Sequence, residues 1–247
     1  MSAGAEVSAD AQHAAPRPEG APSLLGLLFS PDRTMERQAK VGRVRWAFLI
    51  AWLCSILLGA ALAYRMDARQ STLQKLDESG ELKSMSDRQI ADETTKAERV
   101  AQAGQVAKGV VGAPLDLAGA SVAVLALGWF LRGKIKGSAV GPVAAASLLP
   151  GAIARLLDAI AAYQHAQIPP EGIPLSPRTL AALLTLYGHP PGEPWLKLAG
   201  ALDFFSLWSA LILGFGVAAA AQLSRRSALI ATLIAWVCYQ LLTRVAT

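Results

Sequence analysis

Long uncharged runs of apolar residues alternate with polar connections along most of this chain. In the clearest run, from Trp46 to Tyr64, only Ser55 and Gly59 lie outside the apolar set. A bilayer core of about 30 Å needs about 20 helical residues, because backbone groups cannot stay unpaired in lipid. Five segments meet this length or come close to it: 46–64, 109–131, 139–163, 198–224 and 227–243. The pattern predicts an all-α polytopic membrane protein, a helical bundle with five transmembrane helices in a domain that covers residues 46–243.

Composition agrees with a membrane protein. Hydrophobic residues make up 53% of the chain and charged residues 17%, against about a quarter charged in a typical soluble domain. Cys54 and Cys238 each lie inside an apolar run, which excludes a disulfide-framed secreted domain. The net charge of +5 is dispersed, without the basic and aromatic clusters of nucleic-acid binders. We therefore expect the lipid bilayer as a partner and no nucleic acid.

Two segments precede the first span. Residues 1–22 are rich in Ala, Pro, Gly, Ser and Glu and are expected to form a disordered tail. Residues 23–45 are expected to form a juxtamembrane amphipathic helix, since Ser30, Pro31 and Asp32 make a good helix start. Five basic residues follow and favour a position on an anionic membrane face. A plain juxtamembrane helix without a lipid role is the alternative.

A charged extramembrane insertion, residues 65–108, separates the first two spans. Its 44 residues include eight basic and eight acidic side chains. Ser86 and Gln89 form a capping-box pattern, which predicts a helix from there into the second span. The insertion is either a solvated helical hairpin that packs on the bundle or a docking surface for a partner.

A proline-rich loop, residues 164–197, connects the third and fourth spans and holds seven of the fourteen prolines. Within it, Ser176 and Pro177 are expected to start a short apolar helix from Arg178 to Tyr187. That helix is too short to cross a bilayer, so we expect it to lie at the membrane interface or to re-enter the membrane shallowly.

The charges of the short connections give the orientation. Five spans place the termini on opposite sides of the membrane. The loop at 132–136 and the turn at 225–226 are basic and lie on the same side as the N-terminal region. Because basic short loops stay in the cytoplasm, we expect the N-terminus inside and the C-terminus outside.

Four ionisable residues fall within the predicted spans: Asp116, Arg155, Asp158 and Asp203. Each would cost about 2.5–3.5 kcal/mol in hydrocarbon if left without a partner. At 1.5 Å per residue, all four lie about 7–12 Å from the same membrane face. We therefore hypothesise a polar cluster in which Arg155 ties three helices together through carboxylates.

Three roles are open for this cluster. It fixes the register of the helices, it forms a cation or proton site through the two excess carboxylates, or some of its members simply reach the headgroups. The sequence contains no P-loop, dinucleotide-binding glycine pattern, zinc-protease motif or nucleophile elbow. We therefore expect no enzyme, with no catalytic, cofactor-binding or metal-binding residues.

Two stretches resemble the Yip (Ypt/Rab-interacting) domain family of five-span membrane proteins, particularly its bacterial members. One is Leu28–Thr34, which is similar to the family's "FSP" entry ahead of the first span. The other is Leu202–Trp208, with the basic turn at 224–228 after it, which resembles the family's fourth span. The resemblance implies five spans, a cytosolic N-terminus, a bacterial inner membrane and no catalytic residues. Eukaryotic relatives are linked to vesicle traffic and small GTPases, whereas bacterial relatives have no settled role.

These observations predict a non-enzymatic integral membrane protein that organises or binds other membrane components. The alternative is a transport component, such as a small permease or an accessory subunit of an efflux system. Discontinuous spans, which Pro114, Pro142 and Pro150 permit, around a hydrated cavity would favour transport. A dry, closely packed bundle would favour the first function. Abundant small residues allow close packing within the chain or against a second copy.

Overall fold

The computed structural model describes residues 24–41, 43–164, 168, 178–188, 199–200 and 202–245. The expected tail at 1–22 and most of the proline-rich loop lie outside these residues. In the described part, five helical segments are long and apolar enough to cross a membrane: Arg45–Arg65, Asp87–Phe130, Gly137–Gln164, Phe204–Ala221 and Arg225–Thr243. This result confirms the predicted all-α bundle with five transmembrane helices.

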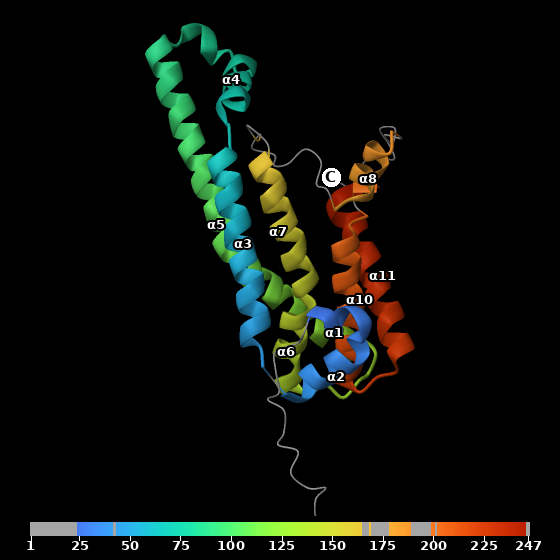
Figure 1. Ribbon diagram of the computed structural model, residues 1–247. Helices are drawn as coiled ribbons and strands as arrows, with labels where there is room; N and C mark the ends of the chain where they lie inside the picture. Colours follow the sequence, from blue (N-terminus) through green and yellow to red (C-terminus); the bar gives the residue numbers. More distant parts are fainter. Residues whose placement is uncertain are drawn as a thin grey trace, which may run out of the picture.

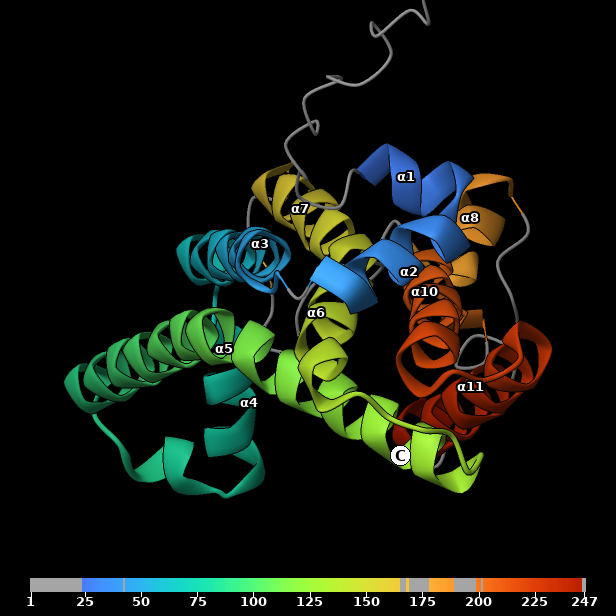
Figure 2. The same cartoon turned by 90° about the horizontal axis from the view of Figure 1, so that it is seen from below.

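The spans are packed in two groups, joined at one end. Helix α3 (Arg45–Arg65) lies between α5 (Asp87–Phe130) and α7 (Leu149–Gln164), while α10 (Phe204–Ala221) packs along α11 (Arg225–Gln240). Figure 1 shows the two groups side by side, with α6 (Gly137–Ser147) at the joined end. Seen from below in Figure 2, α5 crosses from the side of α3 toward α11.

Helix α5 continues from the charged insertion into the second span. Ser86 caps it, and its side chain and that of Gln89 form the predicted capping box. Before it, α4 (Arg69–Glu78) and the short helix η1 (Glu81–Ser84) complete a helical hairpin that projects beyond the other spans (Figure 1). Gly80 has a φ of 74° in the turn between α4 and η1, a conformation that glycine adopts without strain.

The closest helix contact joins α3 and α5. A Cβ atom added to Gly59 would lie 2.8 Å from the Cα atom of Gly109, and one added to Gly109 would lie 2.9 Å from the carbonyl oxygen of Ser55. Only glycine permits such an approach of two backbones, as in other membrane helix pairs. Away from this contact, α3 exposes Leu49, Leu53 and Leu57, apolar side chains suited to lipid.

The third span is broken into α6 and α7 at Leu148. Pro150 lies just after the break, and its ring cannot be accommodated against the carbonyl of residue 146 in a regular helix. The main-chain N–H of Leu148 bonds the carbonyl of Ala145 as the helix tightens, and α7 then proceeds to Gln164. A proline-linked discontinuity is therefore present in the third span, as the sequence permits.

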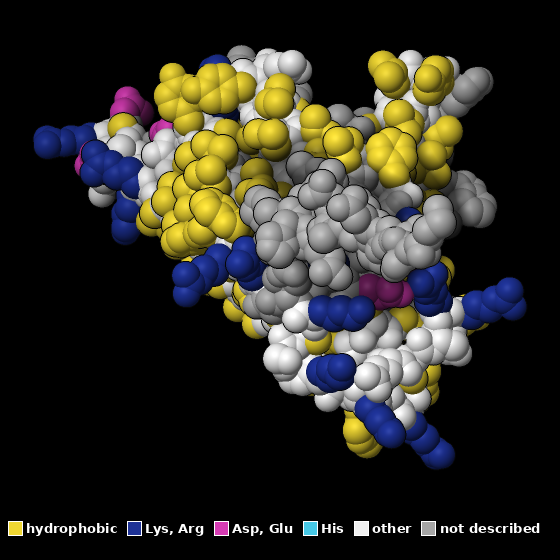
Figure 3. Space-filling view, turned by 60° about the horizontal axis from the view of Figure 1, so that its bottom comes forward, with side chains coloured by type: hydrophobic (Ala, Val, Ile, Leu, Met, Phe, Trp, Pro, Cys, Tyr) yellow, Lys and Arg dark blue, Asp and Glu magenta, His cyan; other side chains and the backbone are white. Residues whose placement is uncertain are grey.

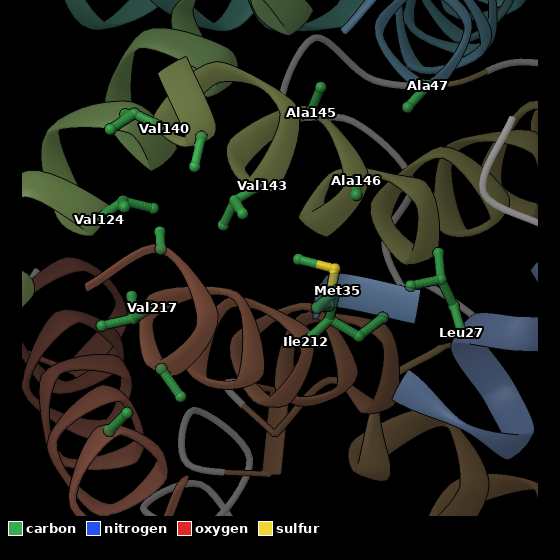
Figure 4. Close-up of a cluster of buried hydrophobic side chains, with 14 of the residues drawn as sticks. Leu27, Met35, Ala47, Val124, Val140, Val143, Ala145, Ala146, Ile212 and Val217 are labelled. Carbon is green, nitrogen blue, oxygen red and sulfur yellow. The ribbon is translucent and has the colours of Figure 1, made fainter. Parts of the chain in front are cut away.

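A core of small side chains fills the end of the bundle where α6 lies. Buried residues from α6 and α10 include Val143, Ile212 and Val217. Figure 4 shows Met35 of α2 (Pro31–Val41) among them. A Cβ on Gly216 would clash with Val143 of α6 and would lie 2.6 Å from the Met35 methyl group, so glycine at this position makes room for both α6 and α2.

The N-terminal helices are docked across this packed end. Helix α1 (Leu24–Phe29) precedes α2, which begins at Pro31 as predicted. Arg225 at the start of α11 pairs with Asp32 at 2.9 Å and with Glu36 at 2.8 Å, which ties α2 to the fifth span. Lys and Arg side chains are spread around this end, as Figure 3 shows. With both acidic side chains of α2 held by Arg225, the exposed side of α2 is basic: Arg33, Arg37 and Lys40.

Two elements begin later than the sequence analysis predicted. The fourth span was expected from Leu198, but α10 begins at Phe204, because the Asp203 side chain accepts the first main-chain N–H groups of the helix. The short helix expected from Arg178 is α8 (Leu180–Leu186), which is capped by the hydroxyl of Thr179. At the other end of the chain, α11 is followed by a π-helical turn, η2 (Leu241–Val245).

Candidate functional site

A pocket of about 600 Å³ opens in the wall of the bundle, between α5, α7, α10 and α11. Most of its lining is apolar or small, and it includes the break between α6 and α7. Four charged residues also line it: Asp116, Arg155, Arg178 and Asp203. Charged side chains around a cavity within the spans make this pocket the candidate functional site of the chain. We call it the polar pocket.

One ion pair joins the two sides of the polar pocket. The guanidinium of Arg155 on α7 contacts the carboxylate of Asp116 on α5. The two side chains differ in exposure, with 42% of Asp116 and 22% of Arg155 accessible. A charged hydrogen bond of this kind is strong in a low-dielectric setting, so it fixes α5 against α7 while leaving part of the Asp116 carboxylate open to the pocket.

A second arginine links α7 to α10. Arg178, which precedes α8, places its Nε atom 3.2 Å from Asp158 and its Nη1 atom 3.1 Å from Asp203. The two carboxylates are almost fully buried, at 8% and 2% exposed. Because removing a charge from water is expensive unless it is paired, this guanidinium is what allows two carboxylates to be buried beside one another.

Asp203 also begins α10. Its Oδ1 atom accepts hydrogen bonds from the main-chain N–H groups of Phe205, at 2.9 Å, and Ser206, at 3.4 Å. The main-chain N–H of Leu180 bonds the carbonyl of Leu202 at 2.9 Å, which fastens the start of α8 to the start of α10. The carboxylate therefore has two roles, as the N-cap of a span and as a ligand of Arg178.

Polar groups of α11 complete the wall. Gln240 donates from Nε2 to the Ser206 hydroxyl at 3.2 Å, which connects α11 to α10. Within the described residues, the indole N–H of Trp236 and the Oε1 atom of Gln240 are buried without a hydrogen-bond partner. Trp236 lines the polar pocket. Unpaired buried groups are unusual, so Trp236 gives this side of the pocket a hydrogen-bond donor that the described residues leave unused.

The structure brings all four expected residues to one region but divides their pairing between two arginines. Arg155 ties α5 to α7 through Asp116, whereas Asp158 and Asp203 are bound by Arg178. Sequence reasoning missed Arg178, which it treated only as a cation of the proline-rich loop. The available signal was a lone arginine next to an apolar helix that is too short to span the membrane. Such a helix folds back on the bundle and brings the arginine toward the charges of the spans.

The described residues contain no group of three or more His, Cys, Asp or Glu side chains placed to hold a metal ion. The carboxylates of the polar pocket are engaged by guanidinium groups. Such an arrangement presents fixed positive and negative charges to the cavity.

The chain was compared with known protein families, with curated proteins and with solved structures. The Yip1 domain family matches residues 25–244, nearly the whole chain. No curated protein and no solved structure matches the chain.

Proposed function

The chain belongs to the Yip1 domain family, and on that premise we propose that it is a non-enzymatic integral membrane protein that organises other membrane components. It does so by holding one such component, an amphiphilic molecule of the bilayer, in the polar pocket. Yip1 domains form a family of membrane proteins, and the outward apolar side chains of α3 and α5 suit contact with lipid.

The observation that carries this proposal is the composition of the polar pocket. Its volume of about 600 Å³ lies within the range of small-molecule sites, about 300–1,000 Å³. Charged groups lie at the end where α10 begins, and apolar residues such as Leu127 and Leu213 line the rest. A cavity that is polar at one end and apolar at the other suits a molecule with the same division.

The ion pairs support binding rather than catalysis. A general acid or base needs a carboxylate that can exchange a proton with a substrate. Asp158 and Asp203 are buried and engaged by Arg178. We therefore assign no catalytic residue to the polar pocket.

Transport is the second candidate function, and the break at Leu148 favours it. Residues on both sides of the break, Ser147 and Gly151, line the polar pocket, and discontinuous helices at a cavity are typical of transporters. Against it stands the packed core at the other end, where Met35 and Val143 fill the space between α6 and α10. A binding site that is open to one side of the bundle fits a holding function better than a path across the membrane.

We further propose that the chain lies in a bacterial inner membrane with the α1–α2 end in the cytoplasm. The basic side chains of α2, of the 132–136 loop and of the turn before α11 support this orientation. The C-terminus and the α4–α5 hairpin then lie on the outer side.

Filling the polar pocket tests the proposal. Gly151 lines it, and a Cβ atom there would meet nothing within 4 Å, so Gly151→Leu starts its side chain in open space and adds bulk to the cavity. Gly104, on α5 outside the pocket, has the same open surroundings, and Gly104→Leu is the matched control. The chain is extracted with its native lipid by an amphipathic polymer, and the bound molecules are counted by mass spectrometry. We expect one retained molecule per chain in the parent and in Gly104→Leu, and its loss in Gly151→Leu. Equal retention in both variants would contradict the proposal.

A further inference from the structure

We propose that the polar pocket selects a zwitterionic phospholipid whose headgroup carries an ammonium group. This inference rests on the proposed function and specifies its ligand. It follows from the charges of the pocket, from the unequal exposure of Asp116 and Arg155, and from the apolar surface next to them.

The charged side chains that line the polar pocket are two carboxylates, from Asp116 and Asp203, and two guanidinium groups, from Arg155 and Arg178. Among these described residues, each carboxylate has a guanidinium partner. An anionic headgroup would add an unbalanced negative charge in a region of low dielectric constant, which is strongly unfavourable. A zwitterionic headgroup adds no net charge.

Asp116 is the group that the cation would contact. Its side chain is 42% exposed, more than any other member of the two ion-pair groups, although it lies within the second span. An ionised carboxylate is costly in hydrocarbon, so its open oxygen needs a donor from outside the protein. An ammonium group has up to three N–H donors and a full positive charge. It would therefore donate a hydrogen bond to this oxygen and also balance the charge of the carboxylate.

Arg155 provides the complement for the phosphate. Its contact to Asp116 uses one nitrogen of a guanidinium that carries five N–H donors in all. The paired side chains form a dipole, with Asp116 negative and Arg155 positive. A zwitterionic headgroup is also a dipole, and it is held most favourably when the ammonium lies against Asp116 and the phosphodiester against Arg155. Phosphodiester recognition by guanidinium groups is common because the geometry permits strong charged hydrogen bonds.

The rest of the polar pocket suits an acyl chain. Leu115, Leu127 and Leu213 line it beside the ion pair, and Gly119 leaves open space on α5. A lipid whose headgroup contacts Asp116 would place a chain along this surface, continuous with the hydrocarbon around the bundle.

Lipid competition in nanodiscs tests the inference. The full chain is reconstituted in an equal mixture of phosphatidylethanolamine and phosphatidylglycerol with identical acyl chains, and retained lipid is measured by native mass spectrometry. We expect phosphatidylethanolamine to be retained about tenfold over phosphatidylglycerol, a ratio equivalent to about 1.4 kcal/mol, because only phosphatidylethanolamine supplies an ammonium group for Asp116. Asp116→Asn should abolish the preference, whereas Asp92→Asn, on the α5 hairpin outside the pocket, should preserve it.

The exchange variant Asp116→Arg with Arg155→Asp keeps an ion pair and reverses its dipole, and it covers the case in which Asp116→Asn does not fold. It should also lose the preference for phosphatidylethanolamine. Retention of both lipids in equal amounts by the parent chain overturns the headgroup inference and leaves the proposed function standing. Retention of neither lipid overturns both. Preferential retention of a lipophilic cation such as tetraphenylphosphonium over phosphatidylethanolamine would show that a positive charge alone is enough. That result overturns the inference that the ligand is a zwitterion.

Discussion

Trp52 donates its indole N–H to the main-chain carbonyl oxygen of Val110, at a distance of 2.8 Å. Val110 lies four residues before Pro114, which has no N–H group and so cannot make the helical hydrogen bond to that carbonyl. Within a membrane, no water is present to replace the missing donor. A side chain of the first span therefore supplies the hydrogen-bond donor that the backbone of the second span lacks at its proline.

Replacing Trp52 by phenylalanine should destabilise the protein by about 1–3 kcal/mol, the usual effect of an unsatisfied polar group. Trp46→Phe is the control, because the Trp46 side chain lies 63% exposed at the start of the same helix. Thermal unfolding in detergent measures both. Adding Pro114→Ala to Trp52→Phe restores a main-chain donor for the Val110 carbonyl and should recover most of the loss. A double variant as unstable as Trp52→Phe alone would refute this explanation.

The contact between α3 and α5 should not tolerate a methyl group. Gly59→Ala places a Cβ atom 2.7 Å from the carbonyl oxygen of Gln105, so the two backbones must separate. We expect a loss of about 1–3 kcal/mol, as for overpacked cores. Gly104→Ala, in open surroundings on α5, should be neutral or slightly stabilising. Equal melting temperatures for the two variants would show that the helices adjust freely at this crossing.

Arg178→Gln should be severely destabilising, by about 3–5 kcal/mol, because it leaves the buried carboxylates of Asp158 and Asp203 without their shared partner. Unfolding in detergent is the measurement, and Arg226→Gln, at the exposed start of α11, is the control. Combining Arg178→Gln with Asp158→Asn and Asp203→Asn removes the two buried negative charges. Asparagine still caps a helix, so this triple variant should regain much of the stability. Failure of the triple variant to recover would mean that the charges are not the cause.

Arg225→Gln should loosen α2. Both acidic side chains of α2, Asp32 and Glu36, pair with Arg225, and the loss of these pairs leaves packing, such as that of the buried Met35, to hold the helix against the bundle. Trypsin should then cut this variant faster after Arg33, Arg37 and Lys40, whereas it should cut the Arg226→Gln variant at the same rate as the parent chain. Because the pairs are exposed, added salt should speed cleavage of the parent and narrow the difference. Identical cleavage of the two variants at low salt would exclude this role for Arg225.

The proposed orientation predicts which parts of the chain react with a reagent added outside the cell. In a Cys54→Ser, Cys238→Ser background, a membrane-impermeant maleimide should label Ser84→Cys on the hairpin in intact cells. It should label Lys134→Cys, in the basic loop before α6, only after the cells are opened. The reverse pattern would invert the orientation.

Local sequence patterns were enough to predict most of the helices. Uninterrupted apolar runs predicted the first span almost to the residue, Trp46–Tyr64 against Arg45–Arg65. The capping box at Ser86 predicted the start of α5, because capping depends on neighbours three residues apart. The start of α10 was predicted too early. Hydropathy does not distinguish an aspartate inside a span from one at its N-cap, although an aspartate directly before a long apolar run is the typical N-cap position.

The polar pocket required knowledge of contacts between distant segments. The sequence identified Asp116, Arg155, Asp158 and Asp203 as charges at one depth, since depth follows from the rise per residue. It did not provide Arg178, because the path of the chain after α7 depends on tertiary packing. That path brings Arg178 to the carboxylates of α7 and α10.

The sequence by itself determined that lipid surrounds this protein, how many helices cross it and where most of them begin, because these properties depend on the local cost of unpaired backbone and charge. Only the tertiary structure decided which charges pair, how the indole of Trp52 serves the carbonyl freed by Pro114, and where a cavity remains. Those features depend on how helices far apart in the sequence approach each other, and short-range patterns contain no information about that approach.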